Sequence, residues 1–191
     1  MDFYEKQIET RTLYRGLIVN VRQDTAELQN GARVPREVVE HPGGVGIVPV
    51  TPENKVLMVR QYRYPMEETL IEIPAGKLEE SEDPLECAVR ELSEETGYTA
   101  GRIVDLGVVY PSPGFCRECL HIYLALDLRQ GESHPDENEF LNVEPYGFGE
   151  LTDMIMKNEL PDAKSIIGIL KASMYLESIK GDFSGKNNPY R

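Results

Sequence analysis

Residues 76–98 read GKLEESEDPLECAVRELSEETGY, and this stretch decides the fold because it joins a well-marked helix to a dense set of carboxylates. Asp83 is a good N-cap residue, Pro84 suits the first helical position, and Glu86 lies three residues after the cap, as in a capping box. Gly97 supplies the left-handed conformation that commonly ends a helix. The stretch therefore predicts a helix that begins at Pro84 and ends before Gly97.

The predicted helix has an apolar side and an acidic side. Four apolar residues at positions i, i+3, i+4 and i+7 form one stripe: Leu85, Ala88, Val89 and Leu92. Glu91, Glu94 and Glu95 are then expected on neighbouring turns of the opposite side. Carboxylates this close repel one another unless a cation or solvent offsets their charge. They suggest a magnesium site for chemistry on phosphates, and the alternative is a solvated acidic face.

Three further residues occur at fixed distances from these acids in the sequence. Gly76, Glu82 and Arg90 complete the pattern G-x5-E-x7-R-E-U-x-E-E-x-G-U, in which U is an aliphatic residue. This pattern resembles the box of the Nudix hydrolases. Tyr98 stands at the last aliphatic position; we expect it to pack the helix end and to affect no ligand. The full match favours the metal site over the solvated face.

Composition limits the classes of function. A net charge of −13 argues against non-specific binding to nucleic acid or to anionic membranes. No apolar run approaches transmembrane length, and residues 1–5 lack the features of a signal peptide. Three cysteines, an odd number, fit a reducing compartment. We therefore expect a cytoplasmic protein whose anionic substrate is bound by local arginines and by metal.

Cys116 and Cys119 form a C-x-x-C spacing with two possible functions. A structural zinc site needs two further ligands, but only Cys87 and three histidines are available, and none repeats the paired spacing. A redox pair usually opens a helix, whereas this one follows Ser112-Pro113-Gly114 in a predicted loop. Ordinary loop cysteines are the favoured interpretation, with metal or redox chemistry as the alternative.

The chain is predicted to be α+β, with a mixed β-sheet sandwiched by helices and an N-terminal antiparallel β-hairpin unit. The N-terminal unit has expected strands at 8–13, 17–24 and 33–40, with a hairpin turn at Asn30-Gly31. The main-domain strands are expected at 45–49, 55–62, 70–73, 103–110, 121–128 and 140–146, and further helices at 148–158 and 162–179. The predicted divisions are 1–42, 43–182 and a flexible tail at 183–191.

Beyond the box, the chain resembles the ADP-ribose pyrophosphatase branch of the Nudix family from about residue 10 to residue 180. Five segments carry this resemblance: residues 36–43 (REVVEHPG), 60–63 (RQYR), 72–76 (EIPAG), 110–115 (YPSPGF) and 136–139 (DENE). A proline shortly beyond the box, here Pro113, is the branch's marker for ADP-ribose. The resemblance implies metal-dependent hydrolysis of ADP-ribose to AMP and ribose 5-phosphate. It also implies a domain-swapped homodimer, in which residues 1–42 form the dimerisation unit.

The same resemblance implies roles for the box residues. The metal ligands are the carbonyl of Ala75 and the carboxylates of Glu91 and Glu95, with Glu139 completing a metal in the closed state. Mg²⁺ is the expected ion because it prefers oxygen ligands, and Mn²⁺ is an alternative. Glu94 and Arg90 assist at the catalytic centre. Gly76 and Glu82 are expected next to the metal ligands and not on the metal. An ion pair between Glu82 and Arg90 would orient the glutamates.

Base and substrate contacts are expected outside the box. Glu137 is the implied general base, although residues 136–139 can also be read as a solvated acidic loop. Arg63 is assigned to a phosphate, and Arg36 with Glu37 to the nucleoside, from the partner subunit. Without the resemblance, Arg36 and Arg63 would be interpreted as ordinary exposed residues of surface strands. Pro113 and Glu118 complete the predicted substrate-binding set, with Glu118 on the ribose side.

Two other functions are compatible with parts of the pattern. One is a Nudix pyrophosphatase for GDP-mannose, another nucleotide sugar or a dinucleoside polyphosphate, which would carry an identical box. The other is a non-catalytic module that senses ADP-ribose or acts as a partner scaffold. Such modules tend to lose box glutamates or to gain a DNA-binding domain, whereas every box acid is present in this chain.

Overall fold

The computed structural model describes residues 3–131 and 140–182, which divide into two compact units. Unit 1 consists of Met1–Gly43 and Tyr110–Leu120, and unit 2 of Gly44–Val109 and His121–Arg191. Unit 1 therefore takes a segment from the middle of the chain in addition to the N-terminal strands. The tail expected at 183–191 lies outside the described residues.

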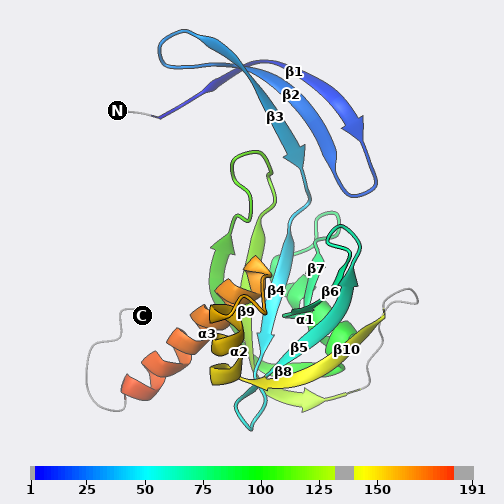
Figure 1. Cartoon of the computed structure of the whole chain (residues 1–191), viewed down its shortest axis with the longest axis vertical. Coiled ribbons are helices and arrows are strands. Elements are labelled where there is room, and N and C mark those ends of the chain that lie inside the picture. The colour runs from blue at the N-terminus through cyan, green and yellow to red at the C-terminus, as the bar shows by residue number, and fades with distance from the viewer. Residues whose placement is uncertain (1–2, 132–139, 183–191) are drawn as a thin grey trace. The chain divides into compact units, whose positions relative to one another are not determined.

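Unit 1 is built on a three-stranded antiparallel sheet (Figure 1) of β1 (Lys6–Arg15), β2 (Asn20–Glu27) and β3 (Arg33–Glu40), in the order β1-β2-β3. Gly31 adopts a φ of 80° in the β2–β3 turn, which explains the Asn-Gly signal. The second segment of the unit is bound to β3 through Val39: its N–H donates to the carbonyl of Phe115 (2.8 Å), and its carbonyl accepts from the N–H of Arg117 (2.9 Å). The antiparallel N-terminal unit is confirmed.

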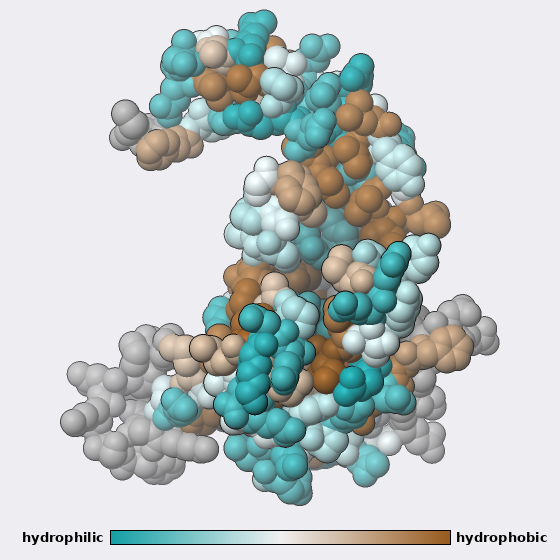
Figure 2. All heavy atoms as spheres, viewed as in Figure 1, coloured by the Kyte–Doolittle hydropathy of each residue, from teal (hydrophilic) through white to brown (hydrophobic). Residues whose placement is uncertain are grey.

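The sheet of unit 1 exposes many apolar side chains. Figure 2 shows hydrophobic side chains, in brown, at its surface among hydrophilic ones. The large ones are Ile8, Leu13, Tyr14, Leu17 and Ile18, and Leu17 is fully exposed. Every residue of β1 is exposed, and Ala26 is the one hydrophobic residue of the described strands of this sheet that is buried. This sheet therefore has little core of its own.

Unit 2 contains two sheets, in the orders β7-β4-β9-β8 and β10-β5-β6 (Figure 1). Their strands are β4 (Gly44–Pro49), β5 (Lys55–Arg63), β6 (Glu68–Glu72), β7 (Ala75–Lys77), β8 (Tyr98–Val109), β9 (Leu120–Gln130) and β10 (Leu141–Gly147). The three-residue strand β7 was not predicted, because it is too short for an alternating pattern to be visible. Most of the other elements agree with the expected ranges within a few residues.

Helices cover both faces of the sheet that contains β4. The helices are α1 (Pro84–Thr96), α2 (Phe148–Met156) and α3 (Ala163–Asp182). Successive side chains of a strand point to opposite faces, and β4 follows this rule. Val45 and Ile47 join the hydrophobic cluster that contains Leu92 of α1, whereas Val48 joins the cluster that contains Ile169 of α3. The predicted α+β fold, with helices on the faces of the sheet, is confirmed.

The described part of the chain contains no helix that is long and apolar enough to cross a membrane. The longest helix, α3, has 20 residues and includes several charged ones.

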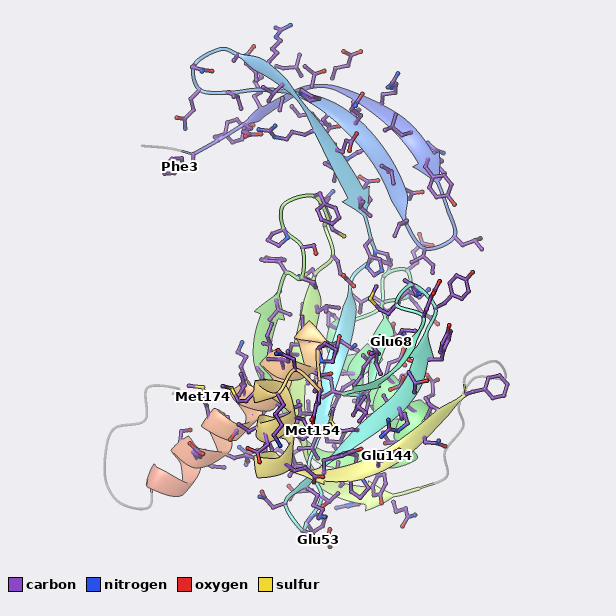
Figure 3. The ribbon with its side chains drawn as sticks, viewed as in Figure 1. Phe3, Glu53, Glu68, Glu144, Met154 and Met174 are labelled. Carbon is purple, nitrogen blue, oxygen red and sulfur yellow. The ribbon has the colours of Figure 1, made fainter. Side chains whose placement is uncertain are left out.

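Glu144 of β10 (Figure 3) forms an ion pair that ties β10 to β5. Arg60 donates from Nε and Nη2 to its two carboxylate oxygens, at 2.7 and 2.9 Å, and the Tyr146 hydroxyl donates at 2.5 Å. The hydrogen bonds from Arg60, and then from Tyr146, lower the pKa of Glu144 from about 4.5 to about 2. The ionised carboxylate therefore stabilises the fold fully above pH 4.5, and this contribution is lost as the pH falls through 2.

Glu144→Gln should lower the free energy of unfolding at pH 7 by about 1 kcal/mol or less, because the pair is partly solvated. It should also make the loss of stability between pH 5 and pH 2 less steep than in the wild type. Urea unfolding curves at several pH values measure both effects. Glu53→Gln, at an exposed position in the β4–β5 turn, is the control. Equal acid sensitivity in Glu144→Gln and wild type would contradict the assignment.

Candidate active site

Helix α1 begins and ends as the sequence predicts. Asp83 Oδ1 accepts hydrogen bonds from the N–H groups of Leu85 (2.8 Å) and Glu86 (3.3 Å). Pro84 occupies the first helical position, and Gly97 ends the helix with a φ of 72°. Both ends of the helix are thus fixed by contacts among nearby residues.

The buried face of α1 differs from the expected one. Glu91 and Glu95 are only 9% and 3% exposed, and they lie on the same buried face as Leu92. Leu85 and Val89, which the apolar stripe assigned to the core, are each 45% exposed. The prediction that the acids lie opposite the apolar side is therefore wrong for Glu91 and Glu95, whereas Ala88 and Leu92 are buried as expected. The reason is that this face packs against the polar backbone of β7 as well as against the apolar core.

Strand β7 brings backbone groups against these two carboxylates. Glu95 Oε2 accepts a 3.0 Å hydrogen bond from the N–H of Ala75. A Cβ atom on Gly76 would lie 1.7 Å from Glu91 Oε1, so glycine is required if this carboxylate is to keep its place. The strand therefore gathers Ala75, Glu91 and Glu95, three of the four predicted metal ligands, around one short segment.

Arg90 binds three of the four box glutamates. Its Nε and Nη2 donate to the two carboxylate oxygens of Glu82 at 2.9 and 3.1 Å. Its Nη1 donates to Glu91 Oε1 at 2.7 Å and to Glu94 Oε2 at 2.9 Å. The hydrogen bonds from Arg90, and then from the N–H of Glu79, lower the pKa of Glu82 to about 2. Arg90 thus offsets the repulsion among the carboxylates.

The three cysteines are free thiols. Cys87 is buried on α1, and burial raises the pKa of its thiol to about 12. It therefore stays protonated at neutral pH and is a poor nucleophile and a poor metal ligand. Cys116 and Cys119 are both partly exposed in unit 1.

The donor set on α1 and β7 fits a hard divalent cation. Carboxylate oxygens of Glu91 and Glu95 and the backbone carbonyl of Ala75 are the ligand types that Mg²⁺ prefers. Within residues 3–131 and 140–182, no three His, Cys, Asp or Glu side chains are grouped as a metal site. Arg90 supplies positive charge to Glu91 and Glu94 in this arrangement. Glu139, the fourth predicted ligand, lies outside the described residues.

Arg63 is held at the end of β5 by a buried carboxylate. Its Nε and Nη2 donate to Glu72 Oε1 and Oε2 at 2.7 and 2.9 Å, and Lys164 also contacts Glu72. Burial raises the pKa of Glu72, but the hydrogen bonds from Arg63 and the charge of Lys164 outweigh it and lower the pKa overall. Lys164 is not among the residues predicted from the sequence. A single lysine near a helix start carries no pattern that could have identified it.

Unit 1 contains a pocket of about 280 Å³ that brings together three of the predicted substrate-binding residues, Arg36, Glu37 and Pro113. Arg36 comes from β3, and Pro113 from the segment that is bound to β3. Phe115, which is largely exposed, lines the same pocket. Segments that are far apart in the sequence thus form one concave surface within this unit.

Charged groups inside this pocket are partly paired. Arg36 donates from Nε and Nη2 to the carboxylate of Glu5 at 2.9 and 2.8 Å, and these hydrogen bonds lower the pKa of Glu5. Arg22 contacts Asp24 Oδ2, whereas Asp24 Oδ1 is buried and accepts no hydrogen bond within the described residues. The Arg36 guanidinium and the Glu5 carboxylate are thus paired charged groups in the lining of the pocket.

Two predicted positions lie elsewhere. Glu118 belongs to unit 1 but does not line the pocket; its Oε1 lies 3.8 Å from His41 Nδ1. The acidic segment 136–139, with the predicted base Glu137, lies outside the described residues. The structure thus gathers the box residues in unit 2 and three of the predicted substrate residues in unit 1.

Comparison with protein families decides the membership of the chain. The NUDIX domain family matches residues 40–167, which is more than half of the 191 residues. The chain belongs to the Nudix family. A second family, described as the nucleoside diphosphate sugar hydrolase N-terminal domain, matches residues 5–39 of this Nudix protein. Nudix hydrolases generally need a divalent metal ion, which agrees with the oxygen donors gathered on α1 and β7.

Known proteins are similar to most of the chain. A methanol dehydrogenase activator of Bacillus methanolicus is 41% identical over 169 residues, 87% of this chain and 91% of the relative. An ADP-ribose pyrophosphatase of Bacillus subtilis (strain 168) is 40% identical over 167 residues, 86% and 90% of the two chains. A crystal structure of an ADP compounds hydrolase has a TM-score of 0.80 at 22% identity and covers 91% of this chain and 94% of that one, which supports the fold. The predicted Nudix hydrolase is confirmed.

Gly76→Ala should displace the Glu91 carboxylate, because its Cβ would lie 1.7 Å from Glu91 Oε1. We expect metal-dependent hydrolysis to fall about 100-fold, since a displacement of about 1 Å at a catalytic centre has that effect. The thermal midpoint should change little, because the side-chain end can move. Gly149→Ala, where the added Cβ meets nothing within 4 Å, is the control. Full activity in Gly76→Ala would show that the place of Glu91 is unimportant.

Proposed function

We propose that this Nudix enzyme hydrolyses the diphosphate of ADP-ribose, and of related nucleoside diphosphate sugars, giving AMP and ribose 5-phosphate from ADP-ribose. The observation that carries the proposal is the inward turn of Glu91 and Glu95 toward Ala75 and Gly76. Oxygen donors gathered in this way suit a hard cation and a phosphate substrate. The 40% identical ADP-ribose pyrophosphatase supports the choice of substrate.

Charge is the main obstacle to this reaction. The negative oxygens of a diphosphate repel a nucleophile, and a chain of net charge −13 adds no general attraction. A divalent cation, when bound, neutralises phosphate charge and makes a water molecule more acidic. Ala75, Glu91, Glu95 and Glu139 would hold this cation, Mg²⁺ by preference and Mn²⁺ as the alternative.

Arg90 would keep the ligands in position during the reaction. Its guanidinium is anchored by Glu82 through two hydrogen bonds and reaches Glu91 and Glu94 with its other nitrogen. Fixed orientation of carboxylates by such partners raises metal affinity and activity. Glu94 would assist at the same place, and Gly76 leaves the space that Glu91 needs.

We assign proton removal to Glu137. A general base has to come within hydrogen-bond reach of the attacking water, and its pKa has to suit proton transfer. The box glutamates are bound by Arg90 and β7, and Glu91 and Glu95 would also hold the cation. An acidic residue outside the box, Glu137, is therefore the proposed base, and Glu139 in the same segment of the sequence would add a ligand.

The nucleoside would bind in the unit 1 pocket of the partner subunit. Arg36 and Glu37 offer charged groups, and Pro113 forms part of the pocket wall. Binding requires Arg36 to exchange its Glu5 carboxylate for the substrate.

The remaining substrate contacts would lie on both sides of the diphosphate. Arg63 would donate to a phosphate with the N–H groups that it does not use on Glu72. Glu118 would face the ribose.

A homodimer with exchanged N-terminal strands would cover the apolar side chains of β1–β3. The sheet exposes Leu13, Tyr14, Leu17 and Ile18, a set that is large for a three-stranded sheet with little core.

Three free thiols agree with the reducing environment of the cytoplasm.

Two alternatives would keep the same fold. A pyrophosphatase for GDP-mannose or for dinucleoside polyphosphates would share the box and differ in the unit 1 pocket. A non-catalytic module that senses ADP-ribose would bind the nucleotide without turnover. The complete set of box acids favours an active enzyme over the sensing module.

A hydrolysis panel with Mg²⁺ separates these functions. ADP-ribose should yield AMP and ribose 5-phosphate, identified by chromatography, whereas GDP-mannose and diadenosine polyphosphates should be cleaved poorly. Glu95→Gln is the matched control: it should lower turnover at least about 100-fold, since it removes a metal-binding charge but no packing. Preferred cleavage of GDP-mannose would change the substrate assignment, and binding without turnover would indicate the sensing module.

Glu137→Gln should lower kcat for ADP-ribose by about 100-fold or more and leave KM nearly unchanged, because a general base acts in the reaction step and not in binding. Steady-state kinetics across pH 6–9 measure both parameters. Glu132→Gln, in the same polar stretch of sequence, is the control. If kcat is unchanged in Glu137→Gln, the base lies elsewhere, with a box glutamate as the next candidate.

A further inference from the structure

A buried group of charged side chains lies close in sequence to Ala75, a proposed metal ligand. Of this group, only Arg63 has a proposed function so far. Glu72 closes β6 three residues before Ala75 and is 1% exposed. It is bound by Arg63 from the end of β5 and by Lys164 from the first turn of α3. A buried carboxylate needs such partners, because burying it unpaired would be very unfavourable.

Lys164 links this carboxylate to the start of α3. Its Nζ contacts Glu72 Oε2 and lies 3.0 Å from Asp162 Oδ2, and its side chain is only 12% exposed. Asp162 Oδ2 also accepts from the N–H (3.0 Å) and the hydroxyl (2.5 Å) of Ser165. Lys164 is therefore held from two sides by fixed carboxylates.

The same helix start is tied to the metal-binding segment. Ser165 is fully buried, and its Oγ accepts a 2.8 Å hydrogen bond from the N–H of Ile73. The chain then runs through Pro74 to Ala75, whose N–H is bound to Glu95. A continuous set of hydrogen bonds thus joins Arg63 and Lys164 to the segment that carries the proposed metal ligands.

The charge balance around Arg63 depends on Lys164. A guanidinium has five N–H donors, and Arg63 uses two of them on Glu72, so three are directed elsewhere. If Arg63 alone paired with Glu72, the pair would be neutral and would attract a phosphate weakly. Lys164 adds a second positive charge. With Asp162 included, the two cations and the two carboxylates are neutral together, whereas without Lys164 the group would carry one net negative charge, which would repel a phosphate at Arg63.

We propose that Lys164 is a positioning residue for phosphate binding by Arg63. Lys164 shares Glu72 with Arg63, so that Arg63 stays oriented by Glu72 and still presents positive charge and N–H donors to the diphosphate of the substrate. The inference rests on the proposed hydrolysis of nucleoside diphosphate sugars, in which Arg63 contacts a phosphate.

Steady-state kinetics of Lys164→Met test the proposal. The KM for ADP-ribose should rise about tenfold, the effect of losing one charge-assisted interaction, and kcat should change less than about threefold. Lys164→Arg, which keeps the charge, should restore most of the KM. Lys157→Met, at an exposed position that ends α2, should match the wild type. Urea unfolding shows whether each variant is folded under the assay conditions.

A double-mutant cycle distinguishes positioning from a general structural role. If Lys164 acts through Arg63, Lys164→Met should change KM less than about twofold when Arg63→Gln is already present. An unchanged KM in Lys164→Met overturns the proposal. An equal rise in KM with and without Arg63→Gln also overturns it, as does a loss confined to kcat.

Failure of the proposed substrate can be recognised separately. If the wild type cleaves a different nucleoside diphosphate sugar of the panel, the same double-mutant cycle is measured on that sugar. The same KM ratios then support or overturn the proposal for Lys164. If the wild type neither cleaves any sugar of the panel nor binds one in isothermal titration calorimetry, both the function and the role of Lys164 are overturned.

Discussion

The hydrogen bonds of Arg90 with Glu82, Glu91 and Glu94, at 2.7 to 3.1 Å, allow α1 to carry carboxylates on a buried face. Without this guanidinium, the mutual repulsion and the loss of hydration would work against packing the helix in this orientation. The buried carboxylate of Glu95 is stabilised differently, because it accepts a hydrogen bond from the backbone N–H of Ala75. Side-chain charge and backbone polarity therefore act together, and β7 has to stay in register with both.

The register of β7 comes from the centre of unit 2. Strand β7 pairs with the first residues of β4, whose side chains enter the two hydrophobic clusters on opposite faces of the sheet. Helix α1 packs in one of these clusters and α3 in the other. The position of the box carboxylates is thus set through β7 by a strand, β4, that is buried on both sides.

The sequence predicted best what depends on nearby residues. Asp83 and Gly97 fixed the ends of α1, and the spacing of the box acids was enough to assign the family. The side of α1 that is buried could not be predicted in this way, because it depends on a β7 segment that shows no periodicity. A buried Glu91 looks like a surface residue in any hydrophobic pattern, and an exposed Val89 looks like a core residue.

Contacts between distant parts of the sequence gave no signal at all. Lys164 contacts Glu72 across 92 positions; Glu72 opens the segment EIPAG, but no motif contains Lys164 and nothing in the sequence pairs the two residues. The segment Tyr110–Leu120 joins unit 1 through its hydrogen bonds to Val39. No change in amino-acid composition along the sequence indicates this. Relationships of this kind follow from the fold, whereas the resemblance to a family points to such residues only where they lie in a shared motif.

The bonds at the start of α3 have a consequence for the order in which the protein is made. Synthesis runs from the N-terminus, so Glu72 and Ile73 leave the ribosome long before Lys164 and Ser165. A nascent chain that ends before residue 163 contains the whole box, but the N–H of Ile73 and the carboxylate of Glu72 still lack their partners from α3. The segment that carries the proposed metal ligands is therefore translated early and completed late, when the last helix docks.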